Sequence, residues 1–215
     1  MTGVKFHEFA HRAMASVANH PDRKVIKLLL KQNVVLQGLD DEDRAELEPH
    51  LLISDGNKGD VLVHQGVREM EQYFILDGIL KRVVSNKEGK EMILRFADGG
   101  EMETSYAAWR LGTPTPYGIV CVTKARVARM PLEAWVAFLD RHPAAKQVFE
   151  YGVMGVMSEI MAHTITLHLL DAPGRVKRFL RKQPRLLDRI PQKELASYLN
   201  LSAETLSRLM HSGIF

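Results

Sequence analysis

The feature that most constrains this chain is a long helical stretch over residues 144–170, AAKQVFEYGVMGVMSEIMAHTITLHLL. No proline interrupts it, and at about 1.5 Å per residue it would be about 40 Å long. Its apolar residues form two seams on different sides of the helix, each with a spacing near 3.5 residues. A helix that is apolar on two sides needs two partners. One partner can be the rest of the chain, and the other is most simply the same helix of a second copy.

We therefore predict a homodimer in which two copies of this helix form a two-fold coiled coil. Burial of the helix inside a monomer is the alternative, although little of the chain remains to cover its second apolar side. The residues predicted for the dimer interface are Tyr151, Val153, Gly155, Val156, Ile160, His163, Leu167 and Leu170.

The remaining segments differ in their periodicity, and together they predict an α+β fold. Residues 1–50 are expected to be helical, because runs such as DDEDRAELEPHLLI begin with carboxylates that suit a helix N-terminus. Residues 51–131 contain short β-rich runs separated by glycines, which predicts an antiparallel β-roll whose last strand is YGIVCVTKARVARM. A short helix and the long helix occupy residues 132–173. The sequence DAPG then separates them from a C-terminal unit, residues 174–215.

Charge is distributed unevenly between these segments. The whole chain has a formal net charge of +3, but residues 174–215 contain nine Lys or Arg against three Asp or Glu, so the rest of the chain is net acidic. A basic unit attached to an acidic body indicates a polyanionic partner such as DNA, and a solvated helical face is the alternative. The candidate contacts to DNA phosphates are Lys177, Arg178, Arg181, Lys182, Arg185 and Lys193.

Within the C-terminal unit, the sequence QKELASYLNLSAETLSRLM has the pattern of two short helices joined by a bend. Leu195, Ala196 and Leu199 lie on one face of the first helix, and the small Ala196 allows a second helix to cross closely. Asn200 falls at the bend, where a left-handed backbone conformation is often required and asparagine tolerates it. Ser202 is a good N-cap for the second helix. These features predict a helix-turn-helix, with a plain helical hairpin as the alternative.

The outward side of the second helix carries the residues expected to read DNA bases. Glu204 and Arg208 are four residues apart, so they project from the same side. A carboxylate can accept a hydrogen bond from cytosine N4, and an arginine can bind guanine O6 and N7 together. Ser202 and Ser207 are expected to make secondary contacts. An ion pair within the helix is the alternative role for Glu204 and Arg208, and it is compatible with base reading.

With these motifs, the chain resembles the Crp/Fnr family of bacterial transcription regulators over nearly its whole length. QKELASYLNLSAETLSRL is similar to the helix-turn-helix of that family, and its ETxSR core resembles the Fnr branch, in which the residues matching Glu204, Ser207 and Arg208 read the half-site. KGDVLVHQG, QYFILDGILKRVV and GKEMILRF are similar to the cyclic-nucleotide-binding β-roll, and residues 144–170 match the dimerisation helix. The resemblance implies a homodimer bound to palindromic double-stranded DNA, with RNA polymerase as a further partner.

The chain departs from the family in the residues that hold a cyclic nucleotide. An ungapped alignment from KEMILRF places Thr104 and Ser105 where the family has Gly-Glu for the ribose hydroxyls, and residues 115–117, Thr-Pro-Tyr, where it has Arg-Ser-Ala for the phosphate. Without the arginine the charge-assisted contact to the phosphate is lost, so cyclic AMP is not expected to bind in the usual way. The residues predicted to line an effector pocket in the roll are Ser105, Tyr106, Thr115 and Tyr117.

Other cofactors find little support in the sequence. The single cysteine, Cys121, is expected to be buried and cannot supply the thiolates of an iron–sulfur cluster. Two histidine pairs leave haem or a metal ion open as an alternative, although neither pair has an acidic or thiol companion; they are His7 with His11 and His163 with His168. No nucleophile–base set, metal signature or phosphate-binding glycine loop indicates an enzyme.

Two further expectations concern the cellular location of the protein and its C-terminus. No apolar run approaches eighteen residues and the first residues lack a secretory signal, so we expect a cytoplasmic protein without a membrane span. The two-stranded wing that follows the helix-turn-helix in better-known members is missing before Phe215, either because it has been lost or because the chain has been clipped. The alternative function is therefore a dimeric small-molecule sensor that does not bind DNA productively.

Overall fold

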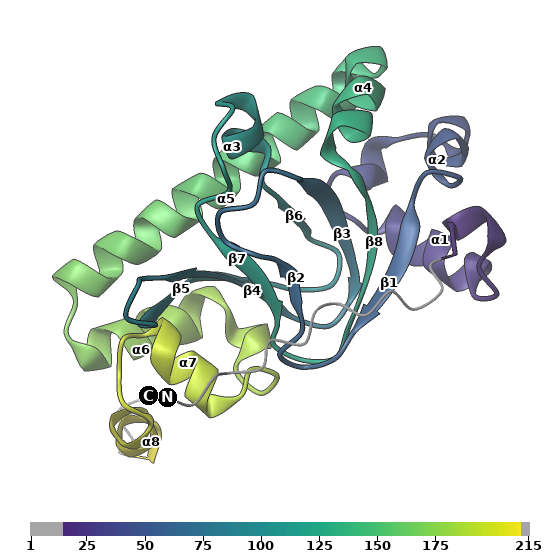
Figure 1. Cartoon of the computed structure of the whole chain (residues 1–215). Coiled ribbons are helices and arrows are strands. Elements are labelled where there is room, and N and C mark those ends of the chain that lie inside the picture. Colours follow the sequence, from purple (N-terminus) through teal and green to yellow (C-terminus); the bar gives the residue numbers. More distant parts are fainter. Residues whose placement is uncertain (1–14, 212–215) are drawn as a thin grey trace.

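The computed structural model describes residues 15–211 and contains two antiparallel sheets with helices around them (Figure 1). The strand order is β1-β8-β3-β6 in the first sheet and β2-β7-β4-β5 in the second. The strands are β1 Leu52–Gly56, β2 Val61–Val63, β3 Glu71–Asp77, β4 Leu80–Ser85, β5 Glu91–Ala97, β6 Met102–Thr104, β7 Gly118–Cys121 and β8 Ala125–Pro131. The predicted α+β fold class is confirmed.

The two sheets pack face to face and share an apolar interior. β3 shows how the strands divide their side chains, because successive residues point to opposite faces of a sheet. Tyr73 and Ile75 join the cluster between the sheets, whereas Phe74 and Leu76 join the cluster beneath the helices on the outer face. β3 is therefore buried along most of its length.

Gly78 makes the tight turn by which the chain leaves β3 in the first sheet and enters β4 in the second. Its φ is +87°, in the left-handed region, and an added Cβ would lie 2.3 Å from the backbone oxygen of Lys124. Only glycine fits a position with both restrictions.

The sequence predicted one continuous strand from Tyr117 to Met130, and this is wrong. The chain bends at residues 122–124 and forms two strands, β7 and β8, that belong to different sheets. The bend is tied to the β3–β4 turn: the backbone nitrogen of Val122 donates to the oxygen of Ile79 at 2.8 Å. The nitrogen of Ile79 in turn donates to Oγ1 of Thr123 at 2.9 Å.

Helices cover the outer face of the first sheet and surround an aromatic core. They are α1 Arg23–Lys31, α2 Asp41–Leu47 and α4 Leu132–Arg141, together with the start of α5 Pro143–Leu169; the short α3 Tyr106–Arg110 follows β6. The Trp135 ring meets Phe74 edge-on at 5.1 Å and Phe149 edge-on at 5.6 Å. These contacts fix the N-terminal half of α5 against the roll.

The C-terminal helices form a compact unit that rests on the outer face of the second sheet (Figure 1). They are α6 Ala172–Lys182, α7 Gln192–Tyr198 and α8 Ala203–His211, with the 3-10 turn Pro184–Leu186 between the first two. The ring centroids of Phe96 on β5 and Tyr198 on α7 lie 5.0 Å apart within one shared apolar cluster. An ion pair of 2.8 Å joins Lys81 on β4 to Glu194 on α7.

Candidate nucleic-acid interface and ligand sites

The bend between α7 and α8 has the local geometry that the sequence predicted. Asn200 has a φ of +52° and is the one non-glycine residue with a positive φ in residues 15–211. The backbone nitrogen of Leu201 donates to the oxygen of Ala196 at 2.9 Å. Ser202 Oγ accepts from the backbone nitrogen of Thr205 at 3.1 Å and so caps the start of α8. The bend is closed by local hydrogen bonds on both sides.

The two helices divide their side chains between the core and the outer surface. Leu195 and Ala196 of α7 and Leu206 of α8 are buried in the cluster shared with the second sheet. Glu204 and Arg208 are exposed on the opposite side of α8, where they border one open surface, and the structure records no ion pair between them. Both charged groups are therefore free to meet a ligand, and Ser207 and Ser202 lie beside them.

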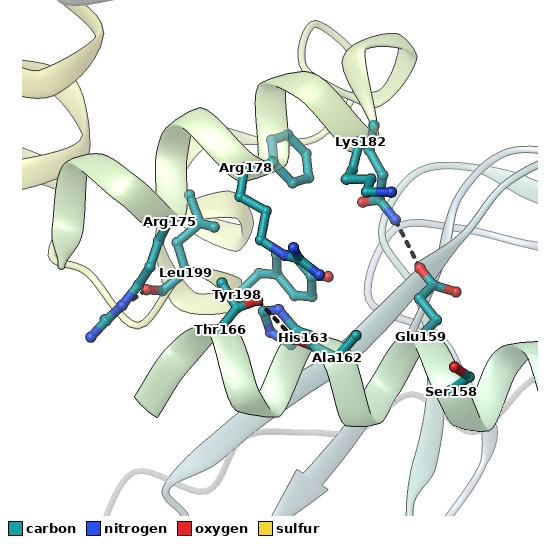
Figure 2. A pocket seen from close by; sticks show the side chains of 12 residues that line it. Ser158, Glu159, Ala162, His163, Thr166, Arg175, Arg178, Lys182, Tyr198 and Leu199 are labelled. Atoms are coloured by element: carbon teal, nitrogen blue, oxygen red, sulfur yellow. Dashed lines mark hydrogen bonds between the residues drawn. The ribbon is translucent and has the colours of Figure 1, made fainter. Parts of the chain in front are cut away.

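The predicted phosphate contacts fall into two groups. Four are exposed on the C-terminal unit and stay candidates for that role: Lys177, Arg181, Arg185 and Lys193. Arg178, which is partly buried, and Lys182, which is exposed, line a cavity between α5, α6 and the end of α7, the hinge cavity, which Figure 2 shows from close by. Their orientation follows from helical spacing, because Arg178 and Lys182 are one turn apart on the inner side of α6.

α5 presents an apolar stripe that the rest of the described chain does not cover. The exposed large apolar residues of this helix are Val148, Tyr151, Met154, Met157, Met161, Ile165 and Leu169. Of the residues predicted for the dimer interface, Tyr151, Gly155 and Leu170 are exposed, and Val156, Ile160 and Leu167 are partly buried.

Two residues of the predicted interface, His163 and Val153, face the chain itself and lie away from the exposed apolar stripe of α5. The His163 ring stacks on Tyr198 with centroids 3.8 Å apart and planes at 5°, and its residue exposure is 8%. Val153 packs against the core under the first sheet. At these two positions α5 turns its side chains toward its own roll and C-terminal unit.

The interior of the roll contains a buried charge cluster that the sequence reasoning missed. Arg82 donates to Glu103 Oε2 through Nε at 3.0 Å and through Nη2 at 2.5 Å. Arg95 donates to Glu103 Oε1 through Nη1 at 2.5 Å and to Glu101 Oε2 through Nη2 at 2.6 Å. Arg95 also lies 3.3 Å from Glu159 on α5, measured from Nε to Oε2. We call these five residues the roll cluster.

The charges of the roll cluster support one another. Burial opposes ionisation of Glu103, but the neighbouring Arg82 and Arg95 outweigh it and hold the pKa of that carboxyl below its usual value. Burial also opposes the charge on Arg95, but Glu103, Glu101 and Glu159 outweigh it and raise the pKa of the guanidinium. Glu103 and Arg95 are therefore favoured in their charged forms, whereas burial raises the pKa of Glu101. The carboxylate of Glu103 is shared by both arginines.

The alternation of inward and outward side chains along β4 and β5 is a sequence signal that indicates this cluster. Arg82 follows Leu80 by two residues and Arg95 precedes Ala97 by two, so both arginines point inward with residues of the interior cluster. A charged residue at an inward position of a strand needs a buried partner.

The structure brings together three of the four predicted effector-pocket residues. Ser105 Oγ lies 3.1 Å from Thr115 Oγ1, and Tyr117 OH donates to the oxygen of Thr104 at 2.7 Å. The guanidinium of Arg82 lies 4.0 Å above the Tyr117 ring. These groups bind one another and the roll cluster.

Tyr106 is turned away from the other three predicted pocket residues and does not join them. Its OH donates to Glu150 Oε1 on α5 at 3.2 Å, and its ring meets Phe149 edge-on at 5.0 Å. Tyr106 begins α3, and this helix directs it toward α5 and away from the interior of the roll.

The remaining cofactor expectations can be placed in the structure. Cys121 is buried, and burial together with Asp60 raises the pKa of its thiol to about 12. His7 and His11 lie outside the described residues, and residues 15–211 contain no group of three His, Cys, Asp or Glu arranged to hold a metal ion. Within the same part of the chain, no helix combines the length and apolar character needed to cross a bilayer.

Comparison with known proteins agrees with this architecture. Residues 57–142 match the model of the cyclic nucleotide-binding domain. The cAMP-activated global transcriptional regulator CRP of Salmonella typhimurium is 22% identical over 159 residues, which cover 69% of this chain and 76% of that protein. The chain therefore contains a cyclic nucleotide-binding domain and is similar to Crp/Fnr-type transcription regulators over most of its length.

Solved structures of Crp/Fnr-type proteins show the same fold at low identity. FixK2 from Bradyrhizobium japonicum has a TM-score of 0.67 at 15% identity, covering 75% of this chain and 83% of its own. A Crp/Fnr-family protein from Eubacterium rectale has a TM-score of 0.66 at 15% identity, covering 85% and 87%. The CRP relatives are transcription regulators, not enzymes.

The Crp/Fnr fold implies a cyclic nucleotide inside the roll, and the residues present do not fit one. Thr115 stands where the family resemblance calls for the phosphate-binding arginine, and its hydroxyl is already bonded to Ser105. The nearby arginine, Arg82, is paired with Glu103 and covers Tyr117. An incoming phosphate would have to compete with a buried carboxylate for the same guanidinium.

Proposed function

We propose that this protein is a homodimeric, sequence-specific DNA-binding transcription regulator that reads a two-fold symmetric site. The observation that carries the proposal is the pair of exposed charges on α8, Glu204 and Arg208, presented above a closed helix-turn-helix bend. An exposed acid and guanidinium at the start of a recognition helix suit cytosine and guanine edges in the major groove.

The dimer is supported by the apolar stripe on α5. Contiguous exposed apolar side chains on a helix usually mark an interaction surface, and a second copy of the same helix offers a matching stripe. Two-fold pairing of α5 would place two copies of α8 about one turn of DNA apart, as half-sites of a palindrome require.

Four polar residues on α8 and at its N-cap have distinct proposed roles. Arg208 would bind guanine through O6 and N7, Glu204 would accept from cytosine N4, and Ser207 and Ser202 would contact a base edge or a phosphate. Lys177, Arg181, Arg185 and Lys193 would contact the phosphate backbone without reading sequence. We also infer that the roll does not bind cyclic AMP in the usual way, because Arg82 and Thr115 are already engaged.

The experiment first selects binding sequences from random duplexes and then measures affinity by fluorescence anisotropy. Arg208→Ala is expected to weaken binding to the selected site by about 1–3 kcal/mol and to relax the preference at one base pair in each half-site. Arg185→Ala is the matched control: it should weaken all sequences alike and reduce the salt dependence of binding.

Two outcomes would contradict the proposal. If Arg208→Ala leaves both affinity and base preference unchanged, the assignment of base reading to α8 is wrong. If the dimer forms but no salt-sensitive, sequence-selective complex with DNA is found, the alternative of a small-molecule sensor without DNA binding is favoured.

A further inference from the structure

The hinge cavity lies where the long helix meets the C-terminal unit. Its walls come from the second half of α5, the inner side of α6 and the end of α7, and its volume is about 360 Å³. Figure 2 shows Arg178 reaching from α6 toward the stacked rings of His163 and Tyr198. A cavity of this size is at the lower end of the range for small-molecule sites.

The cavity is bordered by more positive than negative charge. Arg175, Arg178 and Lys182 line it from α6, and Glu159 is the one acidic residue among its lining residues. Glu159 is already engaged, because it accepts from Gln183 Nε2 at 2.9 Å and pairs with Arg95. The structure records no ion pair for Arg178 or Lys182, whereas the Arg175 guanidinium donates to backbone oxygens of Leu170, Leu199 and Asn200.

Two buried polar atoms at the cavity lack hydrogen-bond partners. They are Nε2 of His163 and Oε1 of Gln183. A buried polar atom left unpaired destabilises the folded state, so such atoms in one cavity indicate a missing partner. Burial lowers the pKa of His163 to about 4, so the imidazole is neutral near pH 7 and one ring nitrogen can accept a hydrogen bond.

We propose that the hinge cavity binds a small organic anion whose carboxylate or phosphate group is held by Arg178 and Lys182. A hydrogen-bonding group elsewhere on the same molecule meets His163 Nε2 and Gln183 Oε1. The volume would hold about ten water molecules, so a bare inorganic ion fills only part of it. Arginine and lysine without acidic partners are the residues that bind such groups in proteins.

A ligand bound in this cavity would contact the helices that support the DNA-reading helix α8. The anion would contact α5 on one side and α6 and α7 on the other, and α7 packs directly on α8. This consequence rests on the proposed function. If ligand and DNA binding are coupled, each changes the equilibrium affinity for the other by the same factor.

The test measures ligand binding by the full-length protein without DNA, so its result does not depend on the proposed function. Isothermal titration uses three probes: 3-phosphoglycerate, which carries a phosphate, a carboxylate and a hydroxyl, then succinate and inorganic phosphate. We expect saturable binding of 3-phosphoglycerate or succinate that is tighter than that of inorganic phosphate. The stronger of the two organic probes identifies the preferred anionic group.

The cation that holds the anion is tested with matched variants of α6. Arg178→Gln is expected to raise the Kd of the organic probe by about tenfold or more, because one charge-assisted contact is lost. Lys182→Gln should act in the same direction. Arg181→Gln removes an equal charge from the outer side of the same helix and should leave ligand binding unchanged.

The proposal is overturned if no probe binds with a Kd below about 10 mM. It is also overturned if Arg178→Gln and Arg181→Gln weaken binding equally, since that would indicate attraction by general charge alone. Circular dichroism melting and sedimentation of each variant establish that it is folded and has the same oligomeric state as the parent. A cavity occupied by a side chain of the partner copy would appear as absence of binding by the dimer, and this too counts against the proposal.

Discussion

The roll interior and the hinge cavity both contain arginines next to buried groups. The arginines of the roll are paired with carboxylates, whereas Arg178 in the hinge cavity is not. In the roll cluster, Arg82 and Arg95 share the carboxylate of Glu103, and each guanidinium has a carboxylate partner at ion-pair distance. In the hinge cavity, Arg178 and Lys182 border an open space without such a partner. The difference teaches that the roll arginines are already balanced by carboxylates, so the cations left for an anion are those of the hinge cavity, as proposed above.

The roll cluster is needed because of the register of two strands. Arg82 on β4 and Arg95 on β5 are direct cross-strand partners, and a bulge just beyond this pair shifts the register of the next residues. Two like charges in that arrangement repel each other. Glu103, on β6 of the opposite sheet, offsets the repulsion and so links the two sheets through their interior.

The largest expected effect comes from removing the shared carboxylate. Glu103→Gln keeps the size of the side chain but leaves two buried arginines without their common partner, which should lower the free energy of unfolding by about 3–5 kcal/mol. Urea denaturation followed by tryptophan fluorescence measures it. Glu101→Gln is the control, because that carboxylate is 42% exposed and contacts one arginine, so its effect should be much smaller. Equal losses in the two variants would mean that the roll cluster is not organised around Glu103.

A smaller effect is expected from protonation at the hinge cavity. The folded pKa of His163, about 4, lies below its unfolded value near 6.5, so the unfolded chain binds more protons between these values. The stabilisation is complete above pH 6.5 and is lost as the pH falls toward 4. The nearby charge of Arg178 acts in the same direction as burial.

We expect the free energy of unfolding of the parent to fall by about 1 kcal/mol more than that of His163→Phe between pH 7 and pH 5, since the ring is partly screened by solvent. Phenylalanine preserves the stacking on Tyr198 and cannot be protonated. Denaturant titrations at both pH values provide the measurement. Parallel pH dependence in the two proteins would show that His163 does not titrate as its burial requires.

The smallest expected effect is that of cyclic AMP on the roll. With Arg82 held by Glu103 and no arginine at position 115, addition of cyclic AMP should leave the melting temperature unchanged, because a ligand stabilises only the state that it binds. Differential scanning fluorimetry measures this. A rise in melting temperature that disappears in Arg82→Gln would show that the nucleotide displaces Glu103, and the contrast between the two sites would fail.

The helix-turn-helix could be predicted because its signals are local. The αL conformation of Asn200, the cap by Ser202 and the buried Leu195 and Leu206 all follow from residue type and short spacing. The α+β class could be predicted for the same reason, from changes in periodicity. The predicted residues of the base-reading surface, Glu204 and Arg208, are exposed together on one side of α8, but their role stays a prediction.

What could not be predicted depends on contacts between distant segments. The meeting of Arg82, Arg95 and Glu103 requires a strand register that no short motif specifies. Likewise, His163 was placed in the dimer interface because it falls on one of the two apolar seams of α5, and spacing alone does not show which seam faces a second copy. Only the position of Tyr198 in α7 shows which side of the helix is already covered.

The joint between α5 and α6 has a mechanical consequence. Only Leu170 and Asp171 separate the two helices, Asp171 caps the second by accepting from the nitrogen of Gly174 at 2.9 Å, and Arg175 Nε donates back to the oxygen of Leu170 at 2.9 Å. A joint so short and so braced leaves little slack between α5 and α6. If α6 rotated there together with the rest of the C-terminal unit, the tip of α8 would be displaced farther than the residues next to the joint.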